Sequence, residues 1–272
     1  MLYGVCTWIF GDEPLSSIFQ RVARMGFDGV ELLGDYERHN PRAVRTLLDA
    51  HGLKAFSLTP LDVDLAHPDP KIRNRALEYY LRLLDFAAEI GAPVVTCHGA
   101  VGRTRPIATS PEEEDLFLEG VTRIAERVSV LGIKVALETL NRYESHLLNT
   151  TKRIKASLAR LNSPAVGILL DTYHMNIEEE DLISAIWEAQ EHLILFHVAD
   201  SNRRGLGKGH IPFIPIFRAL RRTGYRGPVI VECTAPGPDP FSPQKGPGWK
   251  EALLEDIEDS LRFLNLLESL GS

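Results

Sequence analysis

The chain has 272 residues, of which 44% are hydrophobic, and its formal net charge is -7 at pH 7. This charge argues against a nucleic-acid partner, because binding phosphates requires a concentrated basic surface. No apolar run reaches the roughly 18 residues that span a bilayer, and the N-terminus lacks the basic start of a signal peptide, so we expect a cytoplasmic protein without a membrane partner.

Eight short apolar, β-branched segments follow one another along the chain, and most are separated by a segment with helical periodicity. This rhythm indicates repeated βα units. The predicted strands are residues 2–7, 29–33, 54–58, 93–98, 134–138, 166–171, 193–198 and 228–232. One last helix is expected after the eighth strand.

Two kinds of signal mark the helix boundaries. Ser110, Pro111 and Glu113 predict a capping box, with Ser110 as the N-cap of a helix that runs to Val130. Glycine follows several predicted helices, where a left-handed residue would join helix to strand. These glycines are Gly26, Gly52, Gly91, Gly132 and Gly224.

The order of these elements predicts the fold. Strands that are apolar on both faces and joined by helices form a parallel sheet covered by helices. Eight such units in a row favour closure into a (β/α)8 TIM barrel, whose usual length of roughly 250 residues fits residues 1–272 as a single domain. An open doubly wound sheet is the alternative, weakened because no GxGxxG motif follows the first strand. Cys6, Cys97 and Cys233 end strand-like segments and are expected to be buried thiols.

Four metal-capable side chains lie at the ends of the last four predicted strands, where a parallel barrel binds its ligands. They are Glu138, Asp171, His197 and Glu232. Each alone could be an ion-paired or capping residue, but burying three carboxylates at one mouth would be prohibitive without a cation. This donor set suits Mn²⁺, Mg²⁺ or Co²⁺ better than structural Zn²⁺. The coordination positions left open would suit adjacent oxygens of a hydroxy-ketone or diol.

The segments around these residues resemble the D-tagatose/D-psicose (allulose) 3-epimerase family, within the xylose-isomerase-like barrels. The resemblance covers essentially the whole chain. It is most specific in LETLNRYESHLLNT, LLDTYHMNIEE, FHVADSNRRGLGKGHIP and VIVEC. It implies that the four residues hold one divalent ion, with Mn²⁺ preferred and Co²⁺ or Mg²⁺ as alternatives.

The same resemblance implies roles for three further residues. Glu144, His174 and Arg203 take the positions that hold a ketose around O1 to O3. Judged without the family, Glu144 and Arg203 could be solvated loop charges, and His174 a helix-capping residue. Because family members are commonly dimers or tetramers, the resemblance also implies a homodimer or homotetramer that acts on a small sugar.

The expected reaction follows from the pair of glutamates. Epimerising a carbon beside a ketone removes a proton from one face and returns a proton to the other, so it requires a base on each side. Glu138 and Glu232 can serve as this acid/base pair, because their strands approach the ion from different directions. The expected function is therefore interconversion of free ketoses, such as fructose/psicose or tagatose/sorbose, through a cis-enediolate.

Three other functions stay open at this point. An aldose–ketose isomerase of the hydroxypyruvate or rhamnose type would use the same barrel and ion but move a proton between C1 and C2. An apurinic endonuclease would need more histidines at strand ends and a basic groove. A sugar-binding protein without catalysis is disfavoured because both candidate bases are present.

Four more residues have no role implied by the resemblance. Glu31 and His98 end the second and fourth predicted strands. Glu31 could support the metal ligands or line the substrate pocket, or it could simply pair with a neighbouring arginine. His98 could touch the substrate or be a hydrogen-bonded wall residue. Trp8 and Phe213 could provide an apolar wall for the sugar, although scattered aromatic residues more often belong to the core.

Overall fold

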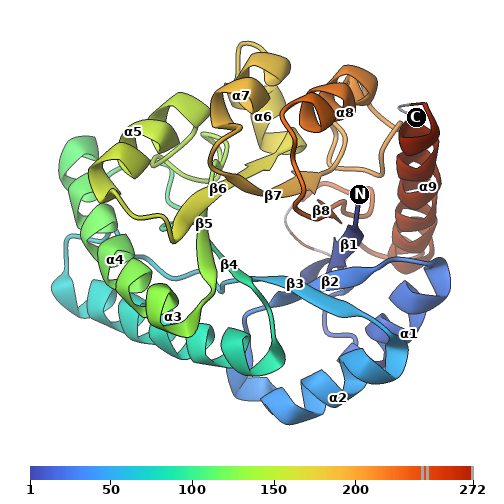
Figure 1. Cartoon of the computed structure of the whole chain (residues 1–272), viewed down its shortest axis with the longest axis horizontal. Coiled ribbons are helices and arrows are strands. Elements are labelled where there is room, and N and C mark those ends of the chain that lie inside the picture. The colour runs from blue at the N-terminus through green and yellow to red at the C-terminus, as the bar shows by residue number, and fades with distance from the viewer. Residues whose placement is uncertain (240–241, 243–244, 271–272) are drawn as a thin grey trace.

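The computed structural model describes residues 1–239, 242 and 245–270. The strands are parallel and form a closed barrel in chain order, because β1 pairs with both β2 and β8 (Figure 1). The strands are β1 (Tyr3–Cys6), β2 (Gly29–Leu33), β3 (Lys54–Thr59), β4 (Val94–Cys97), β5 (Lys134–Glu138), β6 (Val166–Asp171), β7 (Leu193–Val198) and β8 (Val229–Val231). This closure confirms the predicted (β/α)8 TIM barrel and excludes the open sheet.

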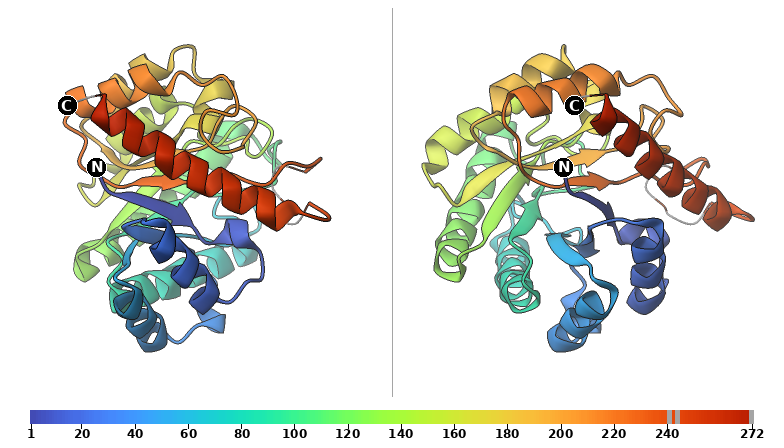
Figure 2. Two further views of the ribbon diagram at one scale, coloured as in Figure 1. Left: turned by 90° about the vertical axis from the view of Figure 1, so that its right-hand side faces the viewer. Right: turned by 45° about the vertical axis from the view of Figure 1, so that its right-hand side comes forward.

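Helices surround the barrel and alternate with its strands (Figure 2). They are α1 (Leu15–Met25), α2 (Pro41–His51), α3 (Pro70–Ile90), α4 (Ser110–Leu131), α5 (Thr151–Leu161), α6 (Thr172–Glu178), α7 (Leu182–Ala189), α8 (Phe213–Arg222) and α9 (Trp249–Ser269), with short 3-10 helices η1 (Trp8–Phe10) and η2 (Tyr36–Arg38). Helix α9 is the predicted last helix, and Figure 1 shows it between α8 and α1. Within the described part of the chain, no helix combines the length and apolarity needed to cross a membrane.

The start of α4 differs from the prediction. The N-cap is Thr109, whose hydroxyl accepts a hydrogen bond from the backbone N–H of Glu112 at 3.3 Å, and Ser110 is already inside the helix. Glu113 does not close a capping box on Ser110. Its carboxylate accepts the backbone N–H groups of Ile107 and Ala108 at 2.6 and 2.8 Å. The prediction of a capping box was wrong because the Glu113 carboxylate binds the backbone of the preceding loop and not the N-terminus of the helix.

The other local signals are confirmed. The five glycines predicted between helix and strand all have positive φ angles, from 67° at Gly52 to 95° at Gly26. A side chain in this left-handed region would be strained, which explains glycine at these turns. The three cysteines are buried and unpaired, as their number and position predicted.

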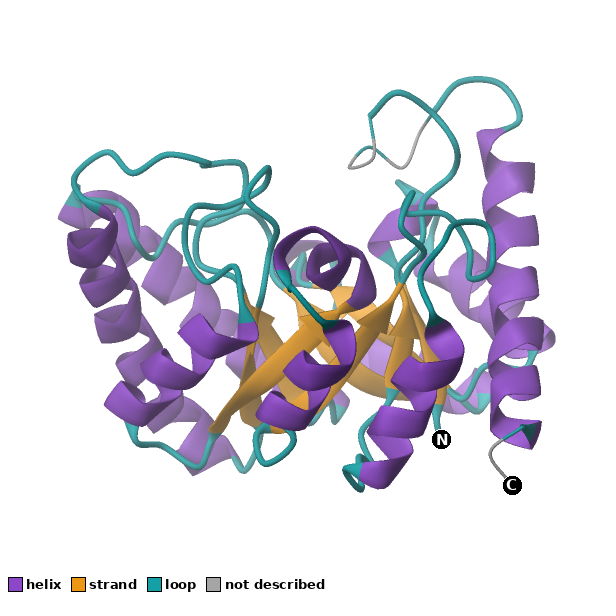
Figure 3. Ribbon diagram, turned by 90° about the horizontal axis from the view of Figure 1, so that it is seen from above, coloured by secondary structure: helices purple, strands orange, loops and turns teal. Residues whose placement is uncertain are grey.

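The strands end at one mouth of the barrel. Figure 3 shows long loops gathered at this end, with the N-terminus at the opposite end. Every residue of β1, β4, β6 and β8 is buried, as expected for parallel strands covered by helices. Because each large apolar side chain contributes about 1.5–3 kcal/mol on burial, this core holds the strand ends firmly and fixes the positions of the side chains that follow them.

Candidate active site

The structure brings the four predicted metal ligands together. Glu138 and Asp171 end β5 and β6, His197 lies in β7, and Glu232 directly follows β8. Asp171 and His197 are paired in register across neighbouring strands. One side-chain donor atom from each of the four residues lies within 4.8 Å of the others, and all four residues are buried. Their spacing in the barrel is therefore suited to a single ion.

Unpaired buried atoms show that this group fits a cation. Within the described chain, Asp171 Oδ2, His197 Nδ1 and Glu232 Oε2 are buried without a hydrogen-bond partner. His197 Nδ1 lies 3.4 Å from Glu232 Oε2 and 3.9 Å from Glu138 Oε1. Leaving a buried polar atom unpaired costs about 1–3 kcal/mol. Atoms with lone pairs that converge in this way are the donors a hard divalent cation prefers.

The electrostatics of the cluster support the same conclusion. Burial raises the pKa of Glu138 well above its ordinary value, and the Glu232 and Asp171 carboxylates add to the shift while His197 opposes it. Burial and Glu232 also raise the pKa of Asp171 to about 8. With raised pKa values, Glu138 and Asp171 must take up protons or a positive ion. A divalent cation would let all three ionise together.

Hydrogen bonds from behind the cluster orient its members. Glu31 is fully buried, and its Oε2 lies 3.1 Å from His197 Nε2 and 2.6 Å from Ser57 Oγ. This contact places the imidazole proton on Nε2 and leaves the Nδ1 lone pair for the cluster. Trp8 Nε1 donates to Glu232 Oε1 at 2.8 Å. Glu31, whose role was open in the sequence, is therefore a positioning residue for His197.

The three predicted sugar-binding residues form a second buried group beside the first. Arg203 Nη1 donates to Glu144 Oε1 at 3.2 Å, and Asn141 Nδ2 donates to the same oxygen at 2.7 Å. Asn141 Nδ2 also lies 2.8 Å from His174 Nδ1, so His174 Nδ1 accepts a hydrogen bond from the Asn141 amide. The proton of the neutral imidazole is therefore on His174 Nε2. That atom is 3.8 Å from Asp171 Oδ2. His174 does not cap α6, because Asp171 is the N-cap residue.

Asn141 is a site residue that sequence reasoning missed. It links Glu144 to His174, which lies 33 residues after Asn141 in the sequence. The only signal in the sequence was its position between Glu138 and Glu144, inside one of the segments that carry the resemblance. An asparagine in a loop is otherwise typical of turns.

Arg203 is held in an unusual backbone conformation. Its φ angle is 57°, in the left-handed region that residues other than glycine rarely adopt. The guanidinium lies 4.9 Å from the centre of the Tyr173 ring and 5.6 Å from that of Trp8. Two backbone hydrogen bonds, from Arg203 N to Asp200 O and from Thr234 N to Arg203 O, hold the loop at 2.8 and 2.7 Å. Strain that the surroundings hold in this way is typical of functional positions.

A pocket of about 420 Å³ opens above these groups. Of the four cluster residues, Glu138 and Glu232 line it, together with Glu144, His174 and Arg203. The opposite wall comes from the ends of β2 and β3 and from the loops after β1, β3 and β4. It comprises Trp8, Leu33, Thr59, Pro60, Leu61, Asp62, His98, Val101 and Gly102, with Leu140 and Tyr143 completing the rim.

The two aromatic residues considered for the wall have different positions. Trp8 lines the pocket. Phe213 is buried and packs edge-to-face against Phe263 of α9, with 5.8 Å between ring centres. Phe213 therefore belongs to the core, which was one of its two open interpretations, because the first turn of α8 faces α9.

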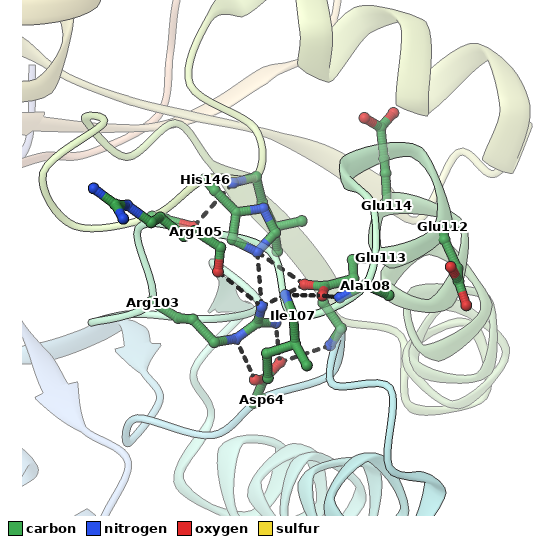
Figure 4. Close-up of polar contacts among 12 residues, drawn as sticks. Asp64, Arg103, Arg105, Ile107, Ala108, Glu112, Glu113, Glu114 and His146 are labelled. Carbon is green, nitrogen blue, oxygen red and sulfur yellow. Dashed lines mark hydrogen bonds and ion pairs between the residues drawn. The ribbon is translucent and has the colours of Figure 1, made fainter.

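An ion-pair cluster around Arg103 ties three mouth loops together (Figure 4). Arg103 Nε and Nη2 donate to Asp64 at 2.9 and 3.2 Å, while Nη1 contacts Glu113 and lies 3.0 Å from His146 Nε2. The backbone of the same loop joins the site directly, because Gly102 N donates to Glu144 O at 2.8 Å. The cluster therefore positions the segment that carries Glu144.

The buried cluster lies at the C-terminal mouth of a closed (β/α)8 barrel, where enzymes of this fold have their active sites. One family description matches the chain. The description, xylose isomerase-like TIM barrel, matches residues 19–265. The chain therefore belongs to the xylose isomerase-like TIM barrel family.

Individual relatives narrow this assignment. A ketose 3-epimerase from Arthrobacter globiformis is 38% identical over 233 residues, which cover 84% of this chain and 80% of the relative. A 3-dehydro-D-guloside 4-epimerase from Escherichia coli (strain K12) is 30% identical over 248 residues, 88% of this chain and 95% of the relative. A crystal structure of D-psicose 3-epimerase in the presence of D-fructose has a TM-score of 0.89 at 25% identity and covers 100% of both chains. Within the family, the chain groups with the ketose 3-epimerases, which are isomerases.

Proposed function

We propose that this chain is a divalent-metal-dependent 3-epimerase of free ketoses. One observation carries the proposal: of the four clustered residues, Glu138 and Glu232 line the pocket, while Asp171 and His197 do not. The two glutamates come from β5 and β8, which are separated by two strands in the barrel. Each can approach a bound sugar from its own side, as inversion at one carbon requires.

In the proposed reaction, one glutamate removes the proton from C3 and the other delivers a proton to the opposite face. A divalent ion held by Glu138, Asp171, His197 and Glu232 would supply positive charge that stabilises the cis-enediolate formed between these two steps. His174 Nε2 and the Arg203 guanidinium are the donors that face the sugar, and we assign them, with Glu144, to holding O1 to O3. Trp8 covers the site and excludes water from it.

The charge of the pocket supports an unphosphorylated substrate. Four carboxylates line the pocket, from Asp62, Glu138, Glu144 and Glu232, and Arg203 is the only lysine or arginine among the described residues that do so. Arg203 already contacts Glu144 and lies 3.6 Å from Glu232. A phosphate dianion would meet repulsion without a free cation to balance it. Neutral sugar hydroxyls meet no such penalty.

Several finer features belong to the same proposal. Mn²⁺ is the ion we expect, with Co²⁺ or Mg²⁺ as alternatives, because the donors are three carboxylates and one imidazole. We further propose that residues 1–272 act as one domain, that the enzyme is a homodimer or homotetramer, and that it works in the cytoplasm. The three free cysteines fit a reducing compartment.

A panel of ketoses incubated with Mn²⁺ tests the reaction class. We expect D-fructose to yield D-psicose, with solvent deuterium entering at C3, as measured by chromatography and NMR. An aldose product would instead support the aldose–ketose isomerase, which moves a proton between C1 and C2. Metal binding without deuterium exchange at C3 of any ketose would support a sugar-binding protein and contradict the proposal.

The relative from Escherichia coli favours a second candidate, because the match covers almost its full length. In a 3-keto glycoside, C4 also lies beside a ketone, so the same two glutamates could invert it. The panel should therefore include a 3-keto glucoside. Turnover of this compound with no turnover of any free ketose would support the second candidate.

The Arg103 cluster yields a prediction about substrate binding. An Arg103→Met variant loses the contacts to Asp64, Glu113 and His146, so the segment carrying Glu144 should shift relative to the ion. We expect KM for the ketose to rise about tenfold or more while the affinity for Mn²⁺ stays unchanged. Steady-state kinetics and calorimetric titration with Mn²⁺ measure the two quantities.

A matched control for this variant is Arg127→Met. Arg127 also forms a two-nitrogen contact with an aspartate, Asp85, but it joins α4 to α3 on the outer surface. KM should stay at the wild-type value in this control. Equal KM values for Arg103→Met and wild type would show that the cluster does not position the site.

A further inference from the structure

The pocket has two chemically different walls. The wall built by β5 to β8 and their loops holds the metal cluster and the group around Arg203. The facing wall, built by the ends of β2 and β3 and the loops after β3 and β4, contributes few polar side chains, among them Thr59, Asp62 and His98. A sugar held at C1 to C3 by the first wall must extend its remaining carbons towards the second.

His98 is the buried titratable residue of this second wall. It directly follows β4 and lines the pocket, with only 8% of its surface exposed. In the described part of the chain, neither ring nitrogen has a hydrogen-bond partner, and Nδ1 is fully buried. A buried imidazole without a partner costs about 1–3 kcal/mol of stability. This cost is explained if the partner is a ligand.

The protonation state of His98 indicates what kind of partner fits. Burial lowers the pKa of the ring to about 4, although the Asp62 and Glu232 carboxylates act in the opposite direction. The ring is therefore neutral at pH 7. Because buried N–H groups without partners are rare, the proton belongs on Nε2, the ring nitrogen that is not fully buried. A neutral N–H donor suits a hydroxyl oxygen.

We propose that His98 is a specificity-determining residue that binds a hydroxyl group on the part of the ketose beyond C3. The inference rests on the proposed function and extends it to the distal end of the sugar. His98 Nε2 donates to an oxygen on C5 or C6, and the exposed Asp62 carboxylate at the rim accepts from a neighbouring hydroxyl. The length and stereochemistry of the sugar beyond C3 then decide how well it binds.

The test compares a long and a short substrate. D-psicose has six carbons, whereas erythrulose keeps C1 to C3 and lacks C5 and C6. In a His98→Leu variant, we expect kcat/KM for psicose to fall at least about tenfold, the effect of one lost hydrogen bond. The value for erythrulose should change much less. A His98→Gln variant places an amide N–H near the position of Nε2 and should recover part of the loss.

Two controls separate this role from a structural one. The affinity for Mn²⁺ should match wild type in both variants, and neither variant should unfold at a lower temperature than wild type. His51→Leu makes the same chemical change at the end of α2, away from the mouth, and should leave kcat/KM unchanged for both sugars.

The outcomes that contradict the inference are distinct from those that contradict the function. Equal losses on psicose and erythrulose, or no loss on either, would overturn the role of His98 while the wild-type activity stands. A wild-type protein that exchanges C3 hydrogen in no ketose would overturn the proposed function and this inference with it.

Discussion

A Glu138→Gln variant is expected to lose about 10²- to 10⁴-fold in ketose turnover, and Glu232→Gln to lose as much. Both side chains line the pocket, and an amide cannot accept the C3 proton. Each variant therefore lacks one of the two bases that inversion requires. Turnover is measured in samples whose Mn²⁺ content has been checked, so that loss of the base is distinguished from loss of the ion.

Isotope exchange sharpens this test. Each variant keeps the base on one face of the sugar, so it should still exchange the C3 hydrogen of one epimer with solvent deuterium, and the two variants should favour opposite epimers. Glu78→Gln is the control, because Glu78 is exposed on α3 and pairs with Arg82. A Glu138→Gln or Glu232→Gln variant that kept more than a tenth of the activity with its ion bound would refute the assignment.

Removal of the divalent ion should abolish turnover, and addition of Mn²⁺ should restore it. The ion should also stabilise the fold, because it brings positive charge to three buried carboxylates. At a free ion concentration of 100 Kd, binding contributes about 2.7 kcal/mol. For a chain of this size, that corresponds to a rise of roughly 5–11 °C in unfolding temperature, which calorimetry can measure.

Two substitutions test how the stabilisation by Mn²⁺ depends on the proposed ligands and on the residue that orients His197. Asp171→Asn removes a proposed ligand that does not line the pocket and should abolish the stabilisation by Mn²⁺. Glu31→Gln leaves all four ligands but weakens the hydrogen bond that orients His197, so affinity should fall about 10- to 100-fold. Asp49→Asn, on the exposed side of α2, is the control. Wild-type affinity in Asp171→Asn would show that the ion does not bind at this cluster.

The barrel and the metal cluster could be predicted from local signals. Runs of β-branched residues and glycines at helix ends marked the βα units, and four of the strands match their predicted bounds in full, as in residues 134–138. Parallel strands in chain order bring their C-terminal residues to one rim. The meeting of Glu138, Asp171, His197 and Glu232 therefore followed from their positions alone.

Other features were decided only by tertiary structure. Glu31 contacts His197 across 166 residues of sequence, and no local pattern carries information about such a pair. The N-cap of α4 is Thr109 and not the predicted Ser110, because the Glu113 carboxylate is held by Arg103 in the preceding loop. His98 turns into the pocket whereas Phe213 turns away from it. These differences share one physical reason: periodicity determines which element a residue belongs to, but the direction of its side chain depends on neighbours that only closure of the barrel supplies.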